Sequence, residues 1–195
     1  MSKRIAYENI FTPQGYLGDV SKNPNLDFLM NIFKIPRIYG VSGFGEWNVG
    51  QHTVATAFLA LYWSAFKRYT QEKRDRLVTL ALVHDAHEAV IGDILPFFKT
   101  RQIRTAIDKI QKDILDSFSI AEEPNLKAEL KLIDMVSFLY EISQSKLSGL
   151  DLSKRKLLQR IYSRQKEAIF DYARQIGIEK SKVVAFLNRI GLQRY

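Results

Sequence analysis

Residues that can bind a metal ion or transfer protons are concentrated in one part of this sequence. All three histidines lie between positions 52 and 87, and two of them belong to the segment ALVHDAHEAVIGD. A further acid, Asp134, interrupts the apolar stretch LKLIDMVSFLY. Burying an unpaired carboxylate is costly, so such an aspartate needs a partner. That partner is either a metal ion or an internal lysine or arginine.

His52, His84, Asp85 and Asp134 form a candidate ligand set of two nitrogens and two oxygens, drawn from three predicted helices. On a helix, His84 and Glu88 are four residues apart and share a face, while Asp85 projects about 100° around the axis and reaches the same point. The chain contains no cysteine, which excludes thiolate-bound zinc, iron–sulfur clusters and thiol nucleophiles. Mixed imidazole and carboxylate ligands suit one divalent ion, Co²⁺, Mn²⁺, Fe²⁺ or Mg²⁺, whose bound water is a potential nucleophile.

Helices must position these residues, because the apolar positions repeat with helical spacing and no useful stretch alternates as a strand does. We therefore predict an all-α fold, a bundle of about six to eight helices. The predicted helices cover residues 24–35, 50–67, 74–90, 101–117, 124–144, 153–176 and 181–189.

The length of 195 residues and the 46% hydrophobic content favour one domain with a substantial core. We predict an N-terminal arm at 1–22, a core at 23–145, and C-terminal helices at 146–195 that pack on the same domain. No apolar run reaches the roughly 20 residues of a membrane span, and the start MSKRIAYENI lacks a signal-peptide core. We expect a cytoplasmic protein that does not contact membranes.

The net charge of +8 favours anionic partners such as nucleotides, phosphates or nucleic acid. The basic run from Lys154 to Arg164 is typical of a solvated helix face, although it also permits an alternative in another class, a non-catalytic helical protein that binds nucleic acid. That alternative leaves the clustered histidines unexplained, so we favour a nucleotide as the partner. A homodimer is compatible with the sequence.

The order of His52, the pair His84-Asp85 and the distant Asp134 resembles the HD-domain phosphohydrolase superfamily. The resemblance covers about residues 30–140 and extends to the nucleotide-hydrolysing, 5′-deoxynucleotidase-like branch. It implies an HD-domain helical bundle and a metal-dependent phosphohydrolase. The further matching features are Arg37, fifteen residues before the first histidine, the sequence NVGQH around His52, Glu88, and the pair Gly92-Asp93.

The resemblance also implies roles for individual residues. Glu88 and Asp93 would position or activate water and manage protons or substrate hydroxyls, and Arg37 would bind phosphate. Apart from the resemblance, we expect Lys99 to add positive charge at the phosphate. His87 occupies a position that varies in the family, which favours a supporting role over that of a metal ligand. Ile38 replaces an aromatic residue that usually follows the arginine, so the selection of the sugar is open.

We predict release of phosphate from nucleoside mono- to triphosphates, in steps of one orthophosphate. The chain also resembles the phosphohydrolase of oxetanocin-type antibiotic biosynthesis, which makes a nucleoside analogue a candidate substrate. The alternative within the same chemistry is a dNTP triphosphohydrolase that releases tripolyphosphate in one cut.

Overall fold

The computed structural model of the protein describes residues 24–37, 47–95, 98–144 and 151–192. The predicted arm at 1–22, Ile38 and most of the glycine-rich loop lie outside the described residues. Within these residues the regular elements are helices, and the only strand-like feature is an isolated antiparallel bridge between Pro36 and Asn48. The predicted all-α fold is confirmed.

The helices follow one another along the chain with short connections, and most begin close to the predicted positions. Their bounds are α3 Leu26–Met30, the 3₁₀ helix η1 Asn31–Lys34, α4 Val49–Lys67, α5 Gln71–Val83, α6 Glu88–Ile91, α7 Arg101–Ser117, α8 Pro124–Ser143, α9 Leu152–Gln175 and α10 Lys180–Arg189. Side-chain caps explain several of the starts. Thr100 and Asp151, for example, accept a hydrogen bond from the backbone of the first turn of α7 and α9.

The predicted helix at 74–90 is wrong in its extent and its continuity. It begins at Gln71, where Thr70 caps it, and it ends at Val83. Residues 84–87 then form a turn before α6. The cause lies in the His84 side chain, whose Nδ1 donates to the Ala81 carbonyl at 2.7 Å and so competes for the acceptor that continues the helix. His84 and Glu88 therefore do not share one helical face, contrary to the prediction.

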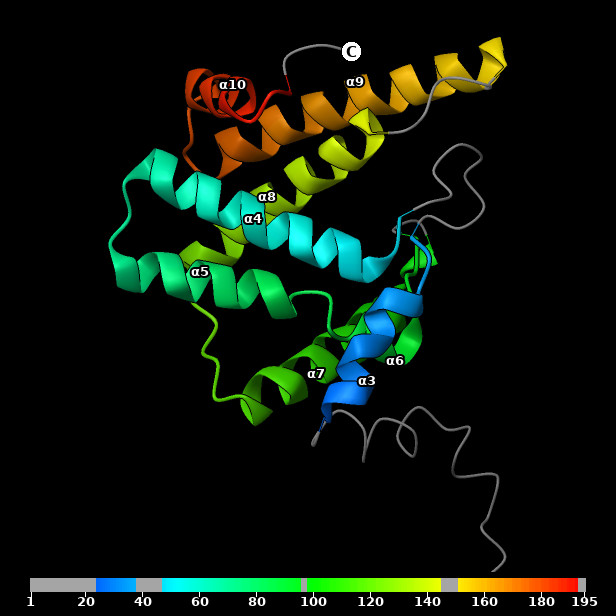
Figure 1. Ribbon diagram of the computed structural model, residues 1–195, viewed down its shortest axis with the longest axis vertical. Coiled ribbons are helices and arrows are strands. Elements are labelled where there is room, and N and C mark those ends of the chain that lie inside the picture. The colour runs from blue at the N-terminus through cyan, green and yellow to red at the C-terminus, as the bar shows by residue number, and fades with distance from the viewer. Residues whose placement is uncertain (1–23, 38–46, 96–97, 145–150, 193–195) are drawn as a thin grey trace, which may run out of the picture.

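One hydrophobic core joins α4, α5, α8, α9 and α10. Its largest fully buried side chains include Trp63, Leu77, Leu139, Ile169 and Phe186. Figure 1 shows α9 and α10 at one end of the molecule and α3, α6 and α7 at the other, with α4 and α8 between them. The helices that carry the metal-ligand candidates are thus central, and their positions depend on packing from both ends.

The segment that carries Arg37 is fastened to the start of α4. The Arg37 backbone N–H donates to the Trp47 carbonyl at 2.9 Å, and that of Val49 donates to Ile35 at 2.9 Å. Phe33 packs so closely on Gly50 that a Cβ at this position would clash with its ring. This close approach places the arginine beside the first turns of α4.

No helix in the part of the chain that the structure describes combines the length and the apolar composition needed to cross a bilayer.

Candidate metal centre

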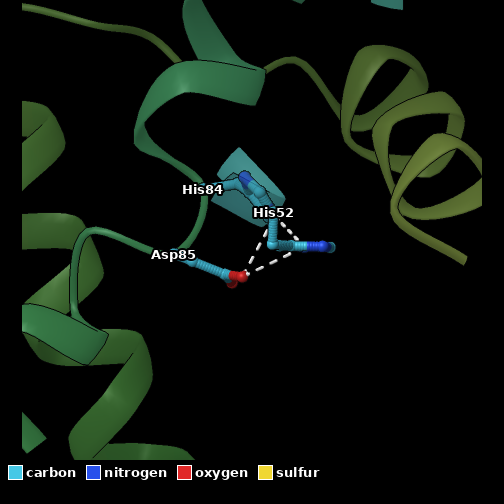
Figure 2. A group of neighbouring side chains, drawn as sticks. All are labelled: His52, His84 and Asp85. Carbon is cyan, nitrogen blue, oxygen red and sulfur yellow. Dashed lines mark hydrogen bonds and ion pairs between the residues drawn. The ribbon is translucent and has the colours of Figure 1, made fainter. Parts of the chain in front are cut away.

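The structure brings the four predicted metal ligands together from three helices and a turn. His52 lies in α4, His84 caps the end of α5, Asp85 belongs to the following turn, and Asp134 lies in α8. His52 Nε2 lies 3.4 Å from Asp85 Oδ2 and 3.1 Å from Asp134 Oδ1. His84 Nε2 lies 3.2 Å from Asp85 Oδ2 and 4.0 Å from Asp134 Oδ1. Figure 2 shows the two rings and Asp85 converging on one point.

Both imidazoles present the same nitrogen to this point. The Nδ1 of His84 donates to the Ala81 carbonyl, and the Nδ1 of His52 donates to Glu141 Oε1 at 2.5 Å. Each ring therefore donates outward through Nδ1 and turns Nε2, the nitrogen that can bind an ion, inward. The two Nε2 atoms are 3.2 Å apart, and two lone pairs at this distance repel each other unless a positive charge lies between them.

The spacing of these atoms fits a single ion. Ligands that bind one ion at about 2.1 Å lie about 3 to 4 Å from one another, which is the range found between the two Nε2 atoms and from each of them to the two carboxylates. The donor set also combines imidazole nitrogen with carboxylate oxygen, as transition ions prefer. His52, His84, Asp85 and Asp134 therefore fit the divalent ion that the sequence predicts.

Electrostatics keep the carboxylates of this cluster ionised. Burial acts to raise the pKa of Asp85, but the charge and the hydrogen bonds of His84 and His52 hold it well below its usual value. Burial acts to lower the pKa of His52, yet the hydrogen bonds that the ring donates to Asp134, Asp85 and Glu141 raise it well above its usual value. The carboxylates thus favour a protonated His52 ring, and its added proton lies where a cation would bind.

Glu141 is a part of the centre that the sequence analysis missed. It is fully buried in α8 and accepts hydrogen bonds from His52 and from Arg37 Nε, the latter at 3.1 Å. A signal was present, because Asp134, Ser137 and Glu141 are spaced three and four residues apart and so share one face of a helix. Ser137 Oγ also lies 3.3 Å from His52 Nδ1.

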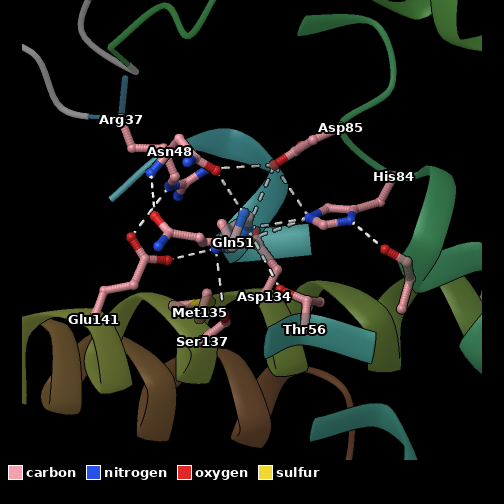
Figure 3. A network of polar contacts seen from close by, with 12 residues as sticks. Arg37, Asn48, Gln51, Thr56, His84, Asp85, Asp134, Met135, Ser137 and Glu141 are labelled. Carbon is pink, nitrogen blue, oxygen red and sulfur yellow. Dashed lines mark hydrogen bonds and ion pairs between the residues drawn. The ribbon is translucent and has the colours of Figure 1, made fainter. Parts of the chain in front are cut away.

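Arg37 reaches the centre from outside the bundle. Its Nη1 lies 3.4 Å from Asp85 Oδ2, so the guanidinium spans Asp85 and Glu141 (Figure 3). Burial acts to lower its pKa, but Glu141 and Asp85 raise it overall, and the side chain stays charged. A permanent positive charge thus lies directly beside the predicted metal ligands, where phosphate would need it.

Glu88 lies at the start of α6 and is 3% exposed. Burial, with the negative charges of Asp85 and Asp93, raises its pKa to about 9, although Arg37 and Lys99 act in the opposite direction. Asp93 and Lys99 are therefore close enough to act electrostatically on Glu88. Arg37, Asp93 and Lys99, all predicted from the sequence, thus act electrostatically on this carboxyl group.

Asp134 has a lysine partner as well as its place among the ligands. Lys131, one turn earlier in α8, lies 2.7 Å from Asp134 Oδ2, while Oδ1 faces His52. A cavity of about 550 Å³ opens beside His84, Asp85 and Asp134. Its walls come from α5, α7, α8 and, through Tyr172, from α9. The centre therefore borders a space large enough for a small organic substrate.

Comparison with known proteins identifies the family. Residues 26–141, more than half of the chain, match the family described as 5′-deoxynucleotidase YfbR-like. The fold is similar to that of the cyanophage S-2L HD phosphohydrolase DatZ, solved with dA and one catalytic Zn²⁺ ion. The two chains are 17% identical with a TM-score of 0.60, and the match covers 80% of this chain and 98% of the phage enzyme. No curated protein matches the sequence.

The matched segment runs from α3 to Glu141 and so contains every metal-ligand candidate. The resemblance inferred from the order of the histidines and aspartates is confirmed. The chain belongs to the YfbR-like 5′-deoxynucleotidase family and is an HD-domain nucleotide phosphohydrolase.

Proposed function

We propose that this enzyme removes phosphate groups one at a time from nucleoside mono-, di- and triphosphates, using one divalent ion held by His52, His84, Asp85 and Asp134. The observation that carries the proposal is the convergence of the two Nε2 atoms and two carboxylates at the edge of an open cavity. The zinc ion of the similar phage enzyme adds Zn²⁺ to the ions predicted from the ligand set, Co²⁺, Mn²⁺, Fe²⁺ and Mg²⁺.

The bound ion would polarise a phosphoryl oxygen and supply water of lowered pKa. Arg37 would bind the transferring phosphate, because its guanidinium offers a second donor face next to Asp85 and remains charged. Glu88 would orient the attacking water and accept its proton. A cation on Asp85 would offset one of the charges that raise the pKa of Glu88, so a larger share of Glu88 would be ionised and able to accept a proton when the centre is loaded.

Stepwise release follows if the centre recognises the phosphate more than the sugar. Arg37 and the cation would bind whichever phosphate is terminal, and Lys99 would add positive charge, so the shortened product can bind again. Asp93 would contact a substrate hydroxyl. A nucleoside analogue would also be accepted, because recognition of the phosphate would leave few contacts that depend on the nucleoside. The alternative is a triphosphohydrolase, in which the α-phosphate alone occupies the centre and tripolyphosphate leaves intact.

A time course of products separates these cases. Purified protein is incubated with dATP and a divalent ion, and nucleotides and inorganic phosphates are followed by chromatography. The proposal expects dADP, then dAMP, then deoxyadenosine, each accompanied by orthophosphate. Tripolyphosphate as the only inorganic product would overturn the stepwise reading, and hydrolysis of dAMP alone would restrict the enzyme to monophosphates.

The metal centre is tested separately by elemental analysis of four variants. Replacing His52, His84, Asp85 or Asp134 with alanine should each remove the ion and abolish phosphate release, because each removes a ligand. Circular dichroism checks that the helices remain. A folded variant that keeps the metal content and turnover of the wild type would remove that residue from the ligand set.

A further inference from the structure

The positive charge of this protein is not spread evenly along the chain. Residues 1–150 contain 18 Lys and Arg against 17 Asp and Glu, whereas residues 151–192 contain ten against four. Most of the net charge of +8 therefore belongs to the stretch that contains α9 and α10, and little of it to the segment that contains the metal centre. Nucleotide binding at that centre does not account for this excess.

The excess is densest in the first half of α9. Between Leu152 and Lys166 the helix has six Lys and Arg and no acid. Three of these cations, Lys156, Arg160 and Arg164, are spaced four residues apart. They therefore share one face of the helix and lie about 6 Å apart along its axis. We refer to these three residues as the basic strip.

The basic strip faces away from the rest of the protein. The buried residues of α9 are Leu158, Tyr162, Ile169 and Ala173, and at about 100° per residue they lie on the opposite side of the helix. All three cations of the strip are exposed. In the part of the chain that the structure describes, no ion pair joins them to an acid. Their charges are thus available to a partner.

The surface between these charges is polar and slightly hollowed. A shallow depression of about 330 Å³ is lined by Lys156, Gln159, Arg160, Ser163, Arg164 and Glu167. Gln159 and Ser163 can add hydrogen bonds to phosphate oxygens, and a guanidinium can bind such oxygens through two N–H groups. The step of about 6 Å between cations is also comparable with the separation of neighbouring phosphates in a nucleic-acid strand.

We propose that the basic strip binds the sugar-phosphate backbone of double-stranded nucleic acid, without regard to its sequence. Side chains that neutralise phosphates release condensed counterions, and this release provides the affinity of such contacts. The strip has no aromatic residue on which unpaired bases could stack, as they do in single-strand binders, so a duplex is the better fit. This binding does not depend on which nucleotide the metal centre hydrolyses.

An anionic membrane is the other polyanion that a basic helix can bind. Helices that lie on a membrane bury a continuous apolar face among the lipids. The apolar face of α9 is already buried inside the protein, and the exposed leucines of its first half, Leu152 and Leu157, do not form such a face. The structure therefore favours a duplex over a bilayer.

Fluorescence anisotropy of a labelled DNA duplex tests the proposal with the full-length protein. A chelator is present and nucleotides are absent, so the outcome is independent of hydrolysis at the metal centre. Three phosphate contacts predict a slope of about −2.7 for the logarithm of the association constant against that of the salt concentration. Raising KCl from about 50 to about 200 mM should therefore weaken binding about 40-fold, and a duplex of unrelated sequence should bind equally.

The basic strip is removed in the triple variant Lys156→Gln, Arg160→Gln, Arg164→Gln. Glutamine keeps a high helix propensity and the three positions are exposed, so circular dichroism should be unchanged. Binding at the lower salt concentration should weaken by at least about 10-fold, and the slope should move towards zero. A wild type that does not bind the duplex, or a triple variant that binds as the wild type does, would overturn the proposal.

Two controls separate the strip from general charge effects. Changing three cations of α7 to glutamine, Arg101→Gln, Lys109→Gln and Lys112→Gln, lowers the net charge equally at the other end of the molecule (Figure 1) and should leave duplex binding unchanged within about twofold. An equal loss in this variant would overturn the proposal. Vesicles that contain phosphatidylserine should bind more weakly than the duplex at the same concentration of negative charge. Equal or tighter binding of the vesicles would overturn it and assign the strip to membranes.

Discussion

Replacing Glu141 by glutamine should weaken metal binding although Glu141 is not itself a ligand. The carboxylate is fully buried and accepts from two donors, His52 Nδ1 and Arg37 Nε. A glutamine of the same shape satisfies only one of them. With its oxygen toward His52, its NH₂ group faces the N–H of Arg37. With the amide reversed, its NH₂ group faces His52 and favours the tautomer that protonates Nε2, which can no longer bind an ion.

The magnitude follows from the number of lost interactions. One charge-assisted hydrogen bond contributes about 1.5 to 3 kcal/mol, and removing a group that orients a ligand typically lowers metal affinity by about 10- to 100-fold. A tenfold change corresponds to about 1.4 kcal/mol, so the two figures agree. We therefore expect the dissociation constant of the divalent ion to rise by about 10- to 100-fold in Glu141→Gln.

Competition with a chelator of known affinity measures this change, and Glu129→Gln is the matched control. Glu129 lies twelve residues earlier in α8, about 18 Å along the axis, and likewise accepts several hydrogen bonds, from Trp63, Tyr69 and Lys73. Its replacement should lower the melting temperature but leave metal affinity unchanged. Wild-type affinity in Glu141→Gln, or an equal loss in Glu129→Gln, would refute the argument that Glu141 orients His52.

Three other variants or conditions give independent tests. Glu88→Ala should keep the divalent ion held by the two histidines and two aspartates but lower turnover by about 10²- to 10⁴-fold, as measured by phosphate release; turnover within a few-fold of wild type would assign proton transfer to another group, such as Asp93. Metal-free protein should lose stability as the pH rises from about 6.5 to about 9. The raised pKa values of Glu88, to about 9, and of His52 mean that the folded state binds more protons than the unfolded state in this range. A melting temperature that stays level or rises with pH in the presence of a chelator would contradict this. Gly50→Ala should reduce the free energy of unfolding by about 1 to 3 kcal/mol, because Phe33 occupies the space of a Cβ; an unchanged denaturation midpoint would show that the ring can move away freely.

The helices and the candidate metal ligands can largely be predicted from local sequence. Apolar spacing and breakers such as Pro36 and Gly177 depend only on neighbouring residues, so the predicted helices agree with α4, α7, α8, α9 and α10 to within a few residues. The order of His52, His84-Asp85 and Asp134 is likewise visible without a structure. Two explanations were predicted for an acid in an apolar helical face, a metal-ligand position and a lysine partner. Asp134 has both, because it lies beside His52 and pairs with Lys131.

The remaining features depend on contacts between residues far apart in the chain. At the break after Val83, the His84 ring bonds to the Ala81 carbonyl through Nδ1 and faces Asp85 through Nε2, and the second of these contacts cannot be read from helical spacing. Glu141 and His52 are 89 residues apart, and nothing local reveals that one sets the tautomer of the other. The hydrogen bond between His87 and Gln111 likewise depends on the packing of α7, which brings Gln111 near. Sequence by itself identified the candidate ligands His52, His84, Asp85 and Asp134. Tertiary structure decided their protonation and orientation, because hydrogen bonds at about 3 Å require atoms that only the folded chain places together.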